Sequence, residues 1–371
     1  MQRLTIPLLR LAAPVAAVLF ALTVSGIVLK LSGSDPFHAF NLMWDFGTTD
    51  QSIASIVDRA VPLYLSGVAF AIAFKMGLFN IGVEGQYTVA ALMAAYVGAS
   101  VSLPPVLHVG LILLVAMASA TLWAAIPAVL KVTRGVHEVI TSIMLNSIAT
   151  FLVSYLLANH FLDRADTTLN LQTAKIDESG WFPDLVKLGD NATINAIVLV
   201  ALVIGVSYYL LIWRTRFGFD LRASGLNPLA ARASGVAPGP MVIKGMMLSG
   251  AVAGLVGMPT LLGFSHNYGL DFGTGLGFAG ITVALLGRNN PVGIAVGALL
   301  LAFLDRSAQI LDLEDIPKEI VVIMEGVIVL SVVIAYELVQ RVIERQQQRM
   351  VGEETPPEAP APAAQPVGAP A

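Results

Sequence analysis

Ten apolar segments, separated by short polar stretches, constrain the fold of this chain more than any other feature. They cover approximately residues 8–31, 53–74, 80–100, 106–130, 138–160, 192–213, 241–263, 276–287, 291–311 and 318–340. Only 12% of the 371 residues are charged and 56% are hydrophobic, whereas a soluble domain carries about 25% charged residues. We therefore expect an all-α, polytopic membrane protein with about ten transmembrane helices.

The shortest segment leaves the number of full spans open. Segment 276–287 contains GFAGITVALLG, which is too short to cross about 30 Å of hydrocarbon as a helix. It predicts a broken or re-entrant helix sheltered inside protein, with eight or nine full spans as the alternatives. The segment 8–31 follows Arg3 and has no clear small-residue cleavage site, so we interpret it as the first span rather than a signal peptide.

Positive charges predict the orientation of the spans. Lysine and arginine residues fall in alternate loops if both termini are cytoplasmic; they are Arg3, Arg10, Lys131, Arg134, Arg214, Arg216, Arg222, Arg232, Lys244, Arg341, Arg345 and Arg349. The extracytoplasmic loop at about 162–191 has room for a small folded cap with Trp181 and Phe182. We divide the chain into a transmembrane domain, 1–345, and a Pro/Ala-rich cytoplasmic tail, 346–371, expected to be disordered.

The most basic cytoplasmic loop, about 217–240, contains the sequence of a short helix, ASGLNPLAARASGVAPG. Asn227 is a good N-cap residue and Pro228 suits the first helical position. Gly235 then ends the helix, with Pro238 just beyond it. Such a helix either docks on a soluble protein or lies on the membrane surface. Its small size and lack of aromatic residues favour docking.

Polar residues inside two apolar segments are candidates for a translocation pathway. KMGLFNIGVEGQYTVAALMAAY places Asn80, Glu84 and Gln86 among glycines. RGVHEVITSIMLNSIATFLVSYLL places Glu138 at the start of a span and Asn146 near the same helix face. Polar groups at membrane depth are expensive unless they are partnered or face water. We expect these five residues to line the path or form its gate, with a structural hinge at Glu84 and a helix–helix hydrogen bond at Asn146 as the alternatives.

Several other activities find no support in the motifs. GLGFAG, Gly275–Gly280, matches a dinucleotide fingerprint but follows no strand of a soluble βαβ unit; tight helix packing is the better interpretation, as for Gly250/Gly254 and Gly293/Gly297. The chain has no P-loop, no hydrolase motif, no cysteine and no histidine cluster at metal-ligand spacing. Its net charge of −4 argues against a nucleic-acid partner.

Four stretches of the chain resemble the permease subunits of ATP-binding-cassette importers, in the branch related to branched-chain amino acid and ribose permeases that handles nucleosides and simple sugars. They are Gly77–Gln86, Val136–Asn146, Leu221–Val236 and Gly277–Gly293. The resemblance covers about residues 8–340. Within it, NIGVEGQ and SIMLN favour nucleosides over sugars.

The resemblance implies a type II importer-like permease that pairs with a second permease chain, either homologous or identical. Two cytoplasmic ATPases would use ATP and Mg, and an extracytoplasmic solute-binding protein would deliver the solute. The chain itself would bind no cofactor. The residues implied for ATPase coupling are Gly225, Asn227, Pro228, Leu229, Ala231 and Gly235.

The resemblance thus implies an inner-membrane permease of a bacterium that carries a nucleoside and performs no covalent chemistry. Import of a simple sugar by the same architecture is the first alternative. An ion-coupled secondary transporter is the second, since Glu84 and Asp305 are acidic groups near membrane depth. An intramembrane enzyme or a scaffold is the third, although no motif requires either.

Overall fold

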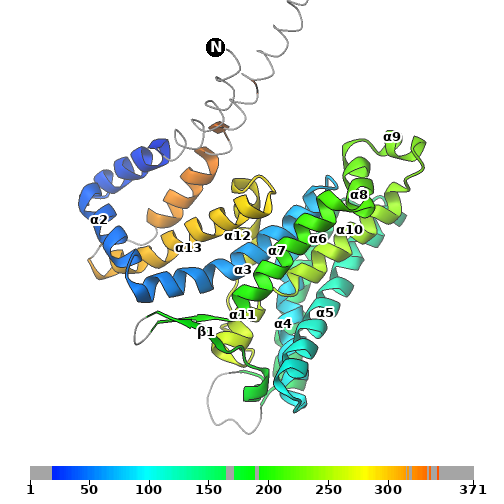
Figure 1. The fold of residues 1–371 in the computed structure, drawn as a ribbon, viewed down its shortest axis with the longest axis horizontal. Helices are drawn as coiled ribbons and strands as arrows, with labels where there is room; N and C mark the ends of the chain where they lie inside the picture. The colour runs from blue at the N-terminus through cyan, green and yellow to red at the C-terminus, as the bar shows by residue number, and fades with distance from the viewer. Residues whose placement is uncertain are drawn as a thin grey trace, which may run out of the picture.

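The computed structural model describes residues 19–163, 171–188, 192–314, 316, 320–331, 334–335 and 341. The start of the first expected span and the expected tail, 346–371, lie outside these residues. Figure 1 shows a helical molecule with the helices α8 and α9 at one end and the strand β1 at the opposite end.

The first half of the described chain consists of long helices joined by short loops. An apolar helix, Leu19–Leu31, comes first. The helices that follow are α2 (Pro36–Gly47), α3 (Asp50–Phe74), α4 (Val83–Ser100), α5 (Pro105–Arg134) and α6 (Glu138–Leu156), which continues as the π-helical turn η1 (Leu157–Phe161).

The second half contains more interruptions. A 3-10 turn, η2 (Glu178–Gly180), precedes the strands β1 (Asp184–Lys187) and β2 (Thr193–Asn195). The helices are α7 (Ile197–Arg214), α8 (Arg216–Leu226), α9 (Pro228–Ala233), α10 (Pro238–Ala253), α11 (Met258–Thr260) with the π-helical turn η3 (Leu261–Ser265), α12 (Leu276–Leu286) and α13 (Pro291–Leu313). A further apolar helix covers Ile320–Ser331.

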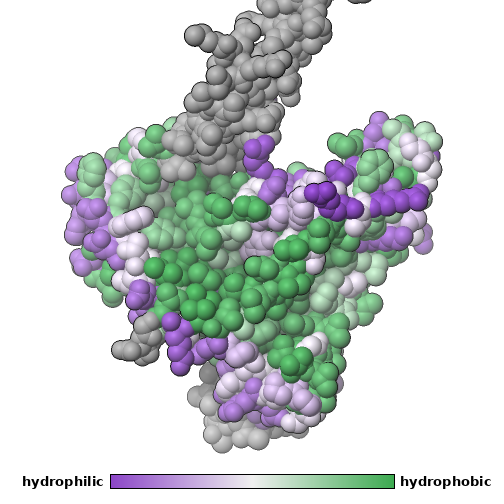
Figure 2. All heavy atoms as spheres, viewed as in Figure 1, coloured by the Kyte–Doolittle hydropathy of each residue, from purple (hydrophilic) through white to green (hydrophobic). Residues whose placement is uncertain are grey.

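Six of the described helices are long and apolar enough to span a membrane, and three shorter apolar helices accompany them. The expected count of about ten spans is therefore not confirmed within these residues. Figure 2 shows hydrophobic residues across the middle of one face, with hydrophilic residues at the α8–α9 end and near the opposite end. This distribution matches a multi-pass membrane protein whose two ends are exposed to water.

The structure corrects the expected element boundaries at several places. The expected loop after the first span contains α2, because Pro36 occupies the first turn and Asp35 accepts a hydrogen bond from the Phe37 backbone N–H at 3.1 Å. The fold is not purely α-helical, because β1 and β2 form an antiparallel hairpin. Segment 192–213 accordingly divides into β2 and α7.

One apolar segment is broken where a continuous span was expected, and another is as short as expected. Segment 241–263 divides into α10, α11 and η3, with Gly254 and Gly257 in the break. Segment 276–287 is confirmed as a short helix, since α12 has 11 residues and packs between α3, α4 and α13. Its burial supplies the shelter that a short helix needs at membrane depth.

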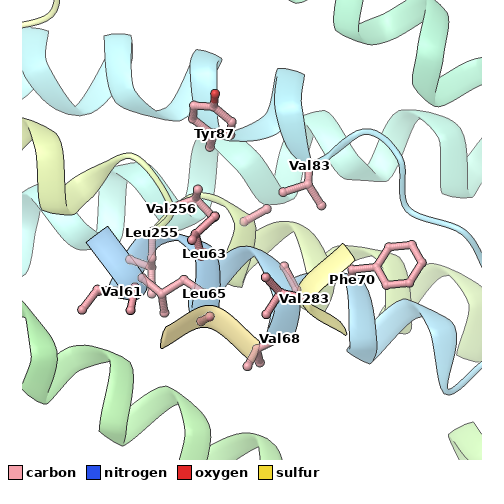
Figure 3. Packing of buried hydrophobic residues seen from close by; sticks show 14 of the residues in the cluster. Val61, Leu63, Leu65, Val68, Phe70, Val83, Tyr87, Leu255, Val256 and Val283 are labelled. Atoms are coloured by element: carbon pink, nitrogen blue, oxygen red, sulfur yellow. The ribbon is translucent and has the colours of Figure 1, made fainter. Parts of the chain in front are cut away.

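Helix α3 forms the centre of the packing. It contacts α7, α10, α12 and α13, and its residues from Val61 to Phe70 pack against Val83, Val256 and Val283 (Figure 3). Small residues let the helix backbones approach most closely. Such close packing is needed because the hydrophobic effect does not drive helices together within lipid.

The small-residue pairs occur where expected. A Cβ added to Gly250 of α10 would lie 2.9 Å from the Ala120 carbonyl oxygen, and one added to Gly254 would lie 3.0 Å from the Ala120 Cβ on α5. A Cβ on Gly280 of α12 would lie 2.5 Å from the Ser66 Cβ on α3. The GLGFAG motif therefore serves helix packing, in agreement with the sequence interpretation.

Candidate functional site

The five expected pathway residues converge on one segment, the α3–α4 loop and the start of α4 (residues 75–86). Asn80 is fully buried and exchanges two hydrogen bonds with Gln86, at 3.0 and 2.9 Å between their amide nitrogen and oxygen atoms. The Asn80 amide also donates to Ser249 Oγ of α10 at 2.8 Å, and this hydroxyl donates to the Ala69 carbonyl oxygen of α3 at 2.6 Å. The amide pair therefore joins α3, α4 and α10.

Asn146 and Glu138 hold the same loop from the other side. The Asn146 amide donates to the Ile81 carbonyl oxygen at 3.0 Å and accepts from the Gly85 N–H at 2.9 Å. Buried Glu138 accepts from Lys131 Nζ at 2.5 Å and from the Phe79 N–H at 3.4 Å. The expected helix–helix hydrogen bond of Asn146 is thus present, made to the loop and first turn of α4.

Glu84 binds the start of α12. Its Oε1 accepts from the Gly275 N–H at 2.6 Å and its Oε2 from the Gly277 N–H at 2.8 Å. The first turns of a helix carry N–H groups without helical partners and a partial positive charge, which a carboxylate satisfies. Glu84 therefore caps the N-terminal end of α12.

None of these five residues lines the cavity that contains Asp58, Arg59 and Asp305, three other charged side chains in the apolar segments. This cavity of about 540 Å³ lies between the first half of α3, the hairpin, α11 and η3, the start of α12, and α13. Its polar lining residues are Gln51, Ser55, Asp58, Arg59, Thr193, Thr260, Thr274 and Asp305. Small-molecule sites commonly measure about 300–1,000 Å³.

The cavity brings together charges that lie within apolar segments. Asp58 is buried and accepts from the Asn195 N–H of β2 at 3.1 Å, which links α3 to the hairpin. Arg59 and Asp305 are exposed and face the same cavity with opposite charges. Ionisable groups at membrane depth usually mark a transport path.

Sequence reasoning missed most of this cavity. Asp58 and Arg59 interrupt the apolar segment 53–74 and Asp305 interrupts 291–311, so the charges themselves were the available signal. Asp305 was considered only as an ion-coupling group. Thr193 and Thr274 carried no signal, because their place depends on the hairpin and on the chain that leads into α12.

The short helix of the basic loop forms as expected. Asn227 Oδ1 accepts from the N–H groups of Leu229 and Ala230 at 3.0 Å each, Pro228 occupies the first turn, and Gly235 follows the helix with φ of 81°. Leu229 is 76% exposed although it is a large apolar side chain. This exposure suggests that another protein surface can bind at Leu229.

The same end of the molecule contains one more helix than expected. Helix α8 precedes α9, and buried Ala231 holds α9 against the rest of the chain. Gly225 of α8 packs directly on the α3–α4 loop, since an added Cβ would lie 2.6 Å from the Met76 carbonyl carbon. Lys75 lies over the Trp213 ring at 5.3 Å, and burial together with nearby Arg222 lowers the pKa of its ammonium group.

Apolar helices long enough to cross a membrane, with charged side chains facing a cavity between them, are features of a membrane transport protein. The family model described as "Branched-chain amino acid transport system / permease component" matches residues 52–333, and the chain belongs to this family. The family is a permease component and is not itself an ATPase.

Three curated relatives span almost the whole of this chain. It is 36% identical to the guanosine ABC transporter permease protein NupP of Bacillus subtilis over 335 residues, 88% of this chain and 94% of the relative. It is 34% identical to the glucose ABC transporter permease protein TsgB13 of Haloferax volcanii, covering 89% of each. It is 29% identical to the nucleoside ABC transporter permease protein NupB of Lactococcus lactis, covering 88% of this chain and 92% of the relative.

Proposed function

We propose that the chain is the transmembrane subunit of an ATP-driven importer and carries a nucleoside through the membrane. The similarity to NupP and NupB supports this cargo. The cavity between α3, the hairpin and α13 would receive the nucleoside, because its hydroxyl, amide and carboxylate groups can bond ribose hydroxyls and base edges.

The capped helix α9 would couple the permease to the ATP-hydrolysing subunits, which act as its motor. Two cytoplasmic subunits bind ATP and Mg, and α9 docks in a cleft of one of them with Leu229 as its apolar contact. The single observation that carries this step is the 76% exposure of Leu229 on a helix that Asn227 caps. The chain supplies the path and leaves ATP hydrolysis to its partners.

The remaining parts of the assembly follow from this arrangement. A second permease chain, identical or homologous, completes the path, and an extracytoplasmic solute-binding protein delivers the cargo to the hairpin end. Both termini and the α8–α9 end face the cytoplasm across the inner membrane of a bacterium, as the positive charges around α8 and α9 favour.

The motor step is tested by co-purification from the native membrane. The tagged chain is expected to retain an ATPase, and Leu229→Asp is expected to weaken this association by about tenfold or more, because a charge would enter an apolar contact. Leu185→Asp is the matched control, since Leu185 is also exposed but lies on the hairpin. Retention of the ATPase by Leu229→Asp would reject α9 as the docking helix.

The cargo is tested by competition in the intact complex. Uptake of labelled guanosine is expected to be inhibited by excess of another nucleoside and not by glucose. The similarity to TsgB13 favours a sugar as the second candidate, and uptake of labelled glucose without uptake of labelled guanosine would establish that alternative.

A further inference from the structure

Residues 266–275 form a strap that runs from the hairpin end back into the protein and leads into α12. The strap begins at His266 and ends at Gly275, which both have positive φ values of 56° and 92°. Glycine adopts this conformation without strain. The backbone thus turns at both ends of the strap.

The outer end of the strap is bonded to the cap segment, residues 171–182. The N–H of Ile176 donates to the His266 carbonyl oxygen at 2.8 Å, and the N–H of Thr173 donates to the Tyr268 carbonyl oxygen at 2.9 Å. The Trp181 ring stacks on the His266 ring with centroids 3.7 Å apart. The cap and the outer strap therefore form one bonded unit.

The inner end of the strap is held by Glu84 of α4. Besides the bonds from Gly275 and Gly277, the Tyr87 hydroxyl lies 3.0 Å from Glu84 Oε1 and 2.9 Å from the Gly273 carbonyl oxygen. It donates its single proton to one or the other of these acceptors. Bonds to an ionised carboxylate are stronger than those between neutral groups, so this end is held firmly.

The same few residues form one wall of the charged cavity. Gly273, Thr274 and Leu276 line it, whereas the N–H groups of Gly275 and Gly277 bind Glu84. The carboxylate and the cavity therefore contact the same short stretch. Any displacement of the stretch from Glu84 changes the shape of the cavity wall.

The contact behind this wall is close packed. A Cβ added to Gly277 would lie 2.7 Å from the Glu84 Cα, so the backbones of α12 and α4 touch. Val83 of α4 and Val283 of α12 are fully buried side chains of the same core (Figure 3). With Glu84 bound, α4 therefore backs the part of the cavity wall that leads into α12.

We propose that Glu84 is a gating latch, a positioning residue that keeps the strap closed over the inner side of the cavity and opens the path when the strap leaves its carboxylate. The inference deepens the proposed function and rests on it for the nature of the cargo. It makes Glu84 a determinant of which side of the membrane the cavity faces.

The absence of cysteine from the chain allows a direct test with Thr274→Cys in the complete transporter, held in membranes without ATP. A membrane-impermeant maleimide is applied from the hairpin side or from the α9 side, and the label is measured on this chain. With Glu84 present, label is expected only from the hairpin side. With Glu84→Gln, label from the α9 side is expected to rise about tenfold, because the acceptor loses its charge.

Two further variants make the result decisive. Tyr87→Phe keeps the carboxylate and both backbone bonds, so a smaller rise is expected; it carries the test if Glu84→Gln does not fold. Glu178→Gln, an exposed carboxylate of the cap, is the matched control and is expected to leave the labelling one-sided. A purely structural role would lower the amount of folded protein without changing the ratio between the two sides.

Equal labelling from both sides with Glu84 present, or one-sided labelling in both Glu84→Gln and Tyr87→Phe, would overturn the latch. Failure of nucleoside uptake with the expected labelling pattern would instead reject the cargo and retain the latch. The two failures are therefore distinguishable in the same membranes.

Discussion

Asn80 and Gln86 are two buried amide side chains that hydrogen-bond each other. Both side chains are at most 1% exposed, and each satisfies the other while Asn80 also reaches Ser249. A buried donor or acceptor left without a partner costs more than the bond itself contributes. The pair therefore holds its three helices in one arrangement with little tolerance.

Replacement of Asn80 by alanine is expected to destabilise the protein by about 1–3 kcal/mol, because the buried Gln86 amide then loses both of its hydrogen bonds to Asn80. The measurement is the melting temperature of the purified protein in mild detergent. Asn159→Ala is the matched control, since Asn159 is exposed and bonds only the Tyr155 carbonyl oxygen of its own helix. Equal melting temperatures for the two variants would contradict the bracing role of the pair.

The role of Asn80, Gln86, Glu138 and Asn146 in gating stays a prediction. All four hold the loop that α8 touches through Gly225, so a movement of α8 would reach them first. Their position suits a hinge better than a wetted wall, since none of them borders the charged cavity.

Among the secondary-structure elements, α12 shows how a short helix is held at membrane depth. Glu84 satisfies its first N–H groups, and Gly280 allows its backbone to lie against Ser66 of α3. Both contacts are made to neighbouring helices and neither comes from within α12. The helix therefore depends on close packing for its place.

Gly280→Ala is expected to lower the free energy of unfolding by about 1–3 kcal/mol through overpacking, because the added Cβ would lie 2.7 Å from the Ser66 carbonyl carbon. Thermal melting and the yield of folded protein report the effect. Gly326→Ala is the matched control, since among the described residues no atom outside its own helix turn lies within 4 Å of its added Cβ. Equal melting temperatures for the two variants would show that α12 can shift to accommodate the added methyl group and that the close contact does not stabilise the protein.

The elements that local sequence could predict are those whose cause is local. Apolar length predicted α3, α5 and α13, and cap chemistry at Asn227 and Gly235 predicted α9. The break in segment 241–263 was missed because its apolar character continues through Gly254 and Gly257.

The sequence also identified the residues around the α3–α4 loop but not their partners. Asn80 and Ser249 lie 169 positions apart, and Glu84 and Gly275 lie 191 apart. No period or motif along the chain encodes such pairs. The cavity was missed for the same reason, since its walls come from five separate parts of the chain.

At the scale of the whole molecule, the two hydrophilic ends differ in their content of arginine residues. The α8–α9 end contains Arg216, Arg222 and Arg232, whereas the opposite end consists of the hairpin and the cap (Figure 1). A positive excess marks the cytoplasmic side of a membrane protein. The proposed motor and the proposed solute-binding protein therefore meet the chain at opposite ends.

Single cysteines test this orientation in the otherwise cysteine-free chain. Ser234→Cys, beside α9, is expected to react with an impermeant maleimide only in inside-out vesicles. Asp184→Cys, on β1, is expected to react only in right-side-out vesicles; both parent residues are exposed. Labelling of both positions from one side would show that the chain does not cross the membrane between them as proposed.

The close approach of Gly225 to Met76 has a mechanical consequence. A larger side chain at this joint would place rotatable, compressible atoms between the two backbones, and a small displacement would be absorbed there. Because the two backbones are in direct contact, a displacement of α9 and α8 would be transmitted to the α3–α4 loop with little loss. In the proposed importer, the lack of a side chain at Gly225 would therefore determine how much of a displacement of α8 reaches the α3–α4 loop, independently of how tightly the ATPase is bound.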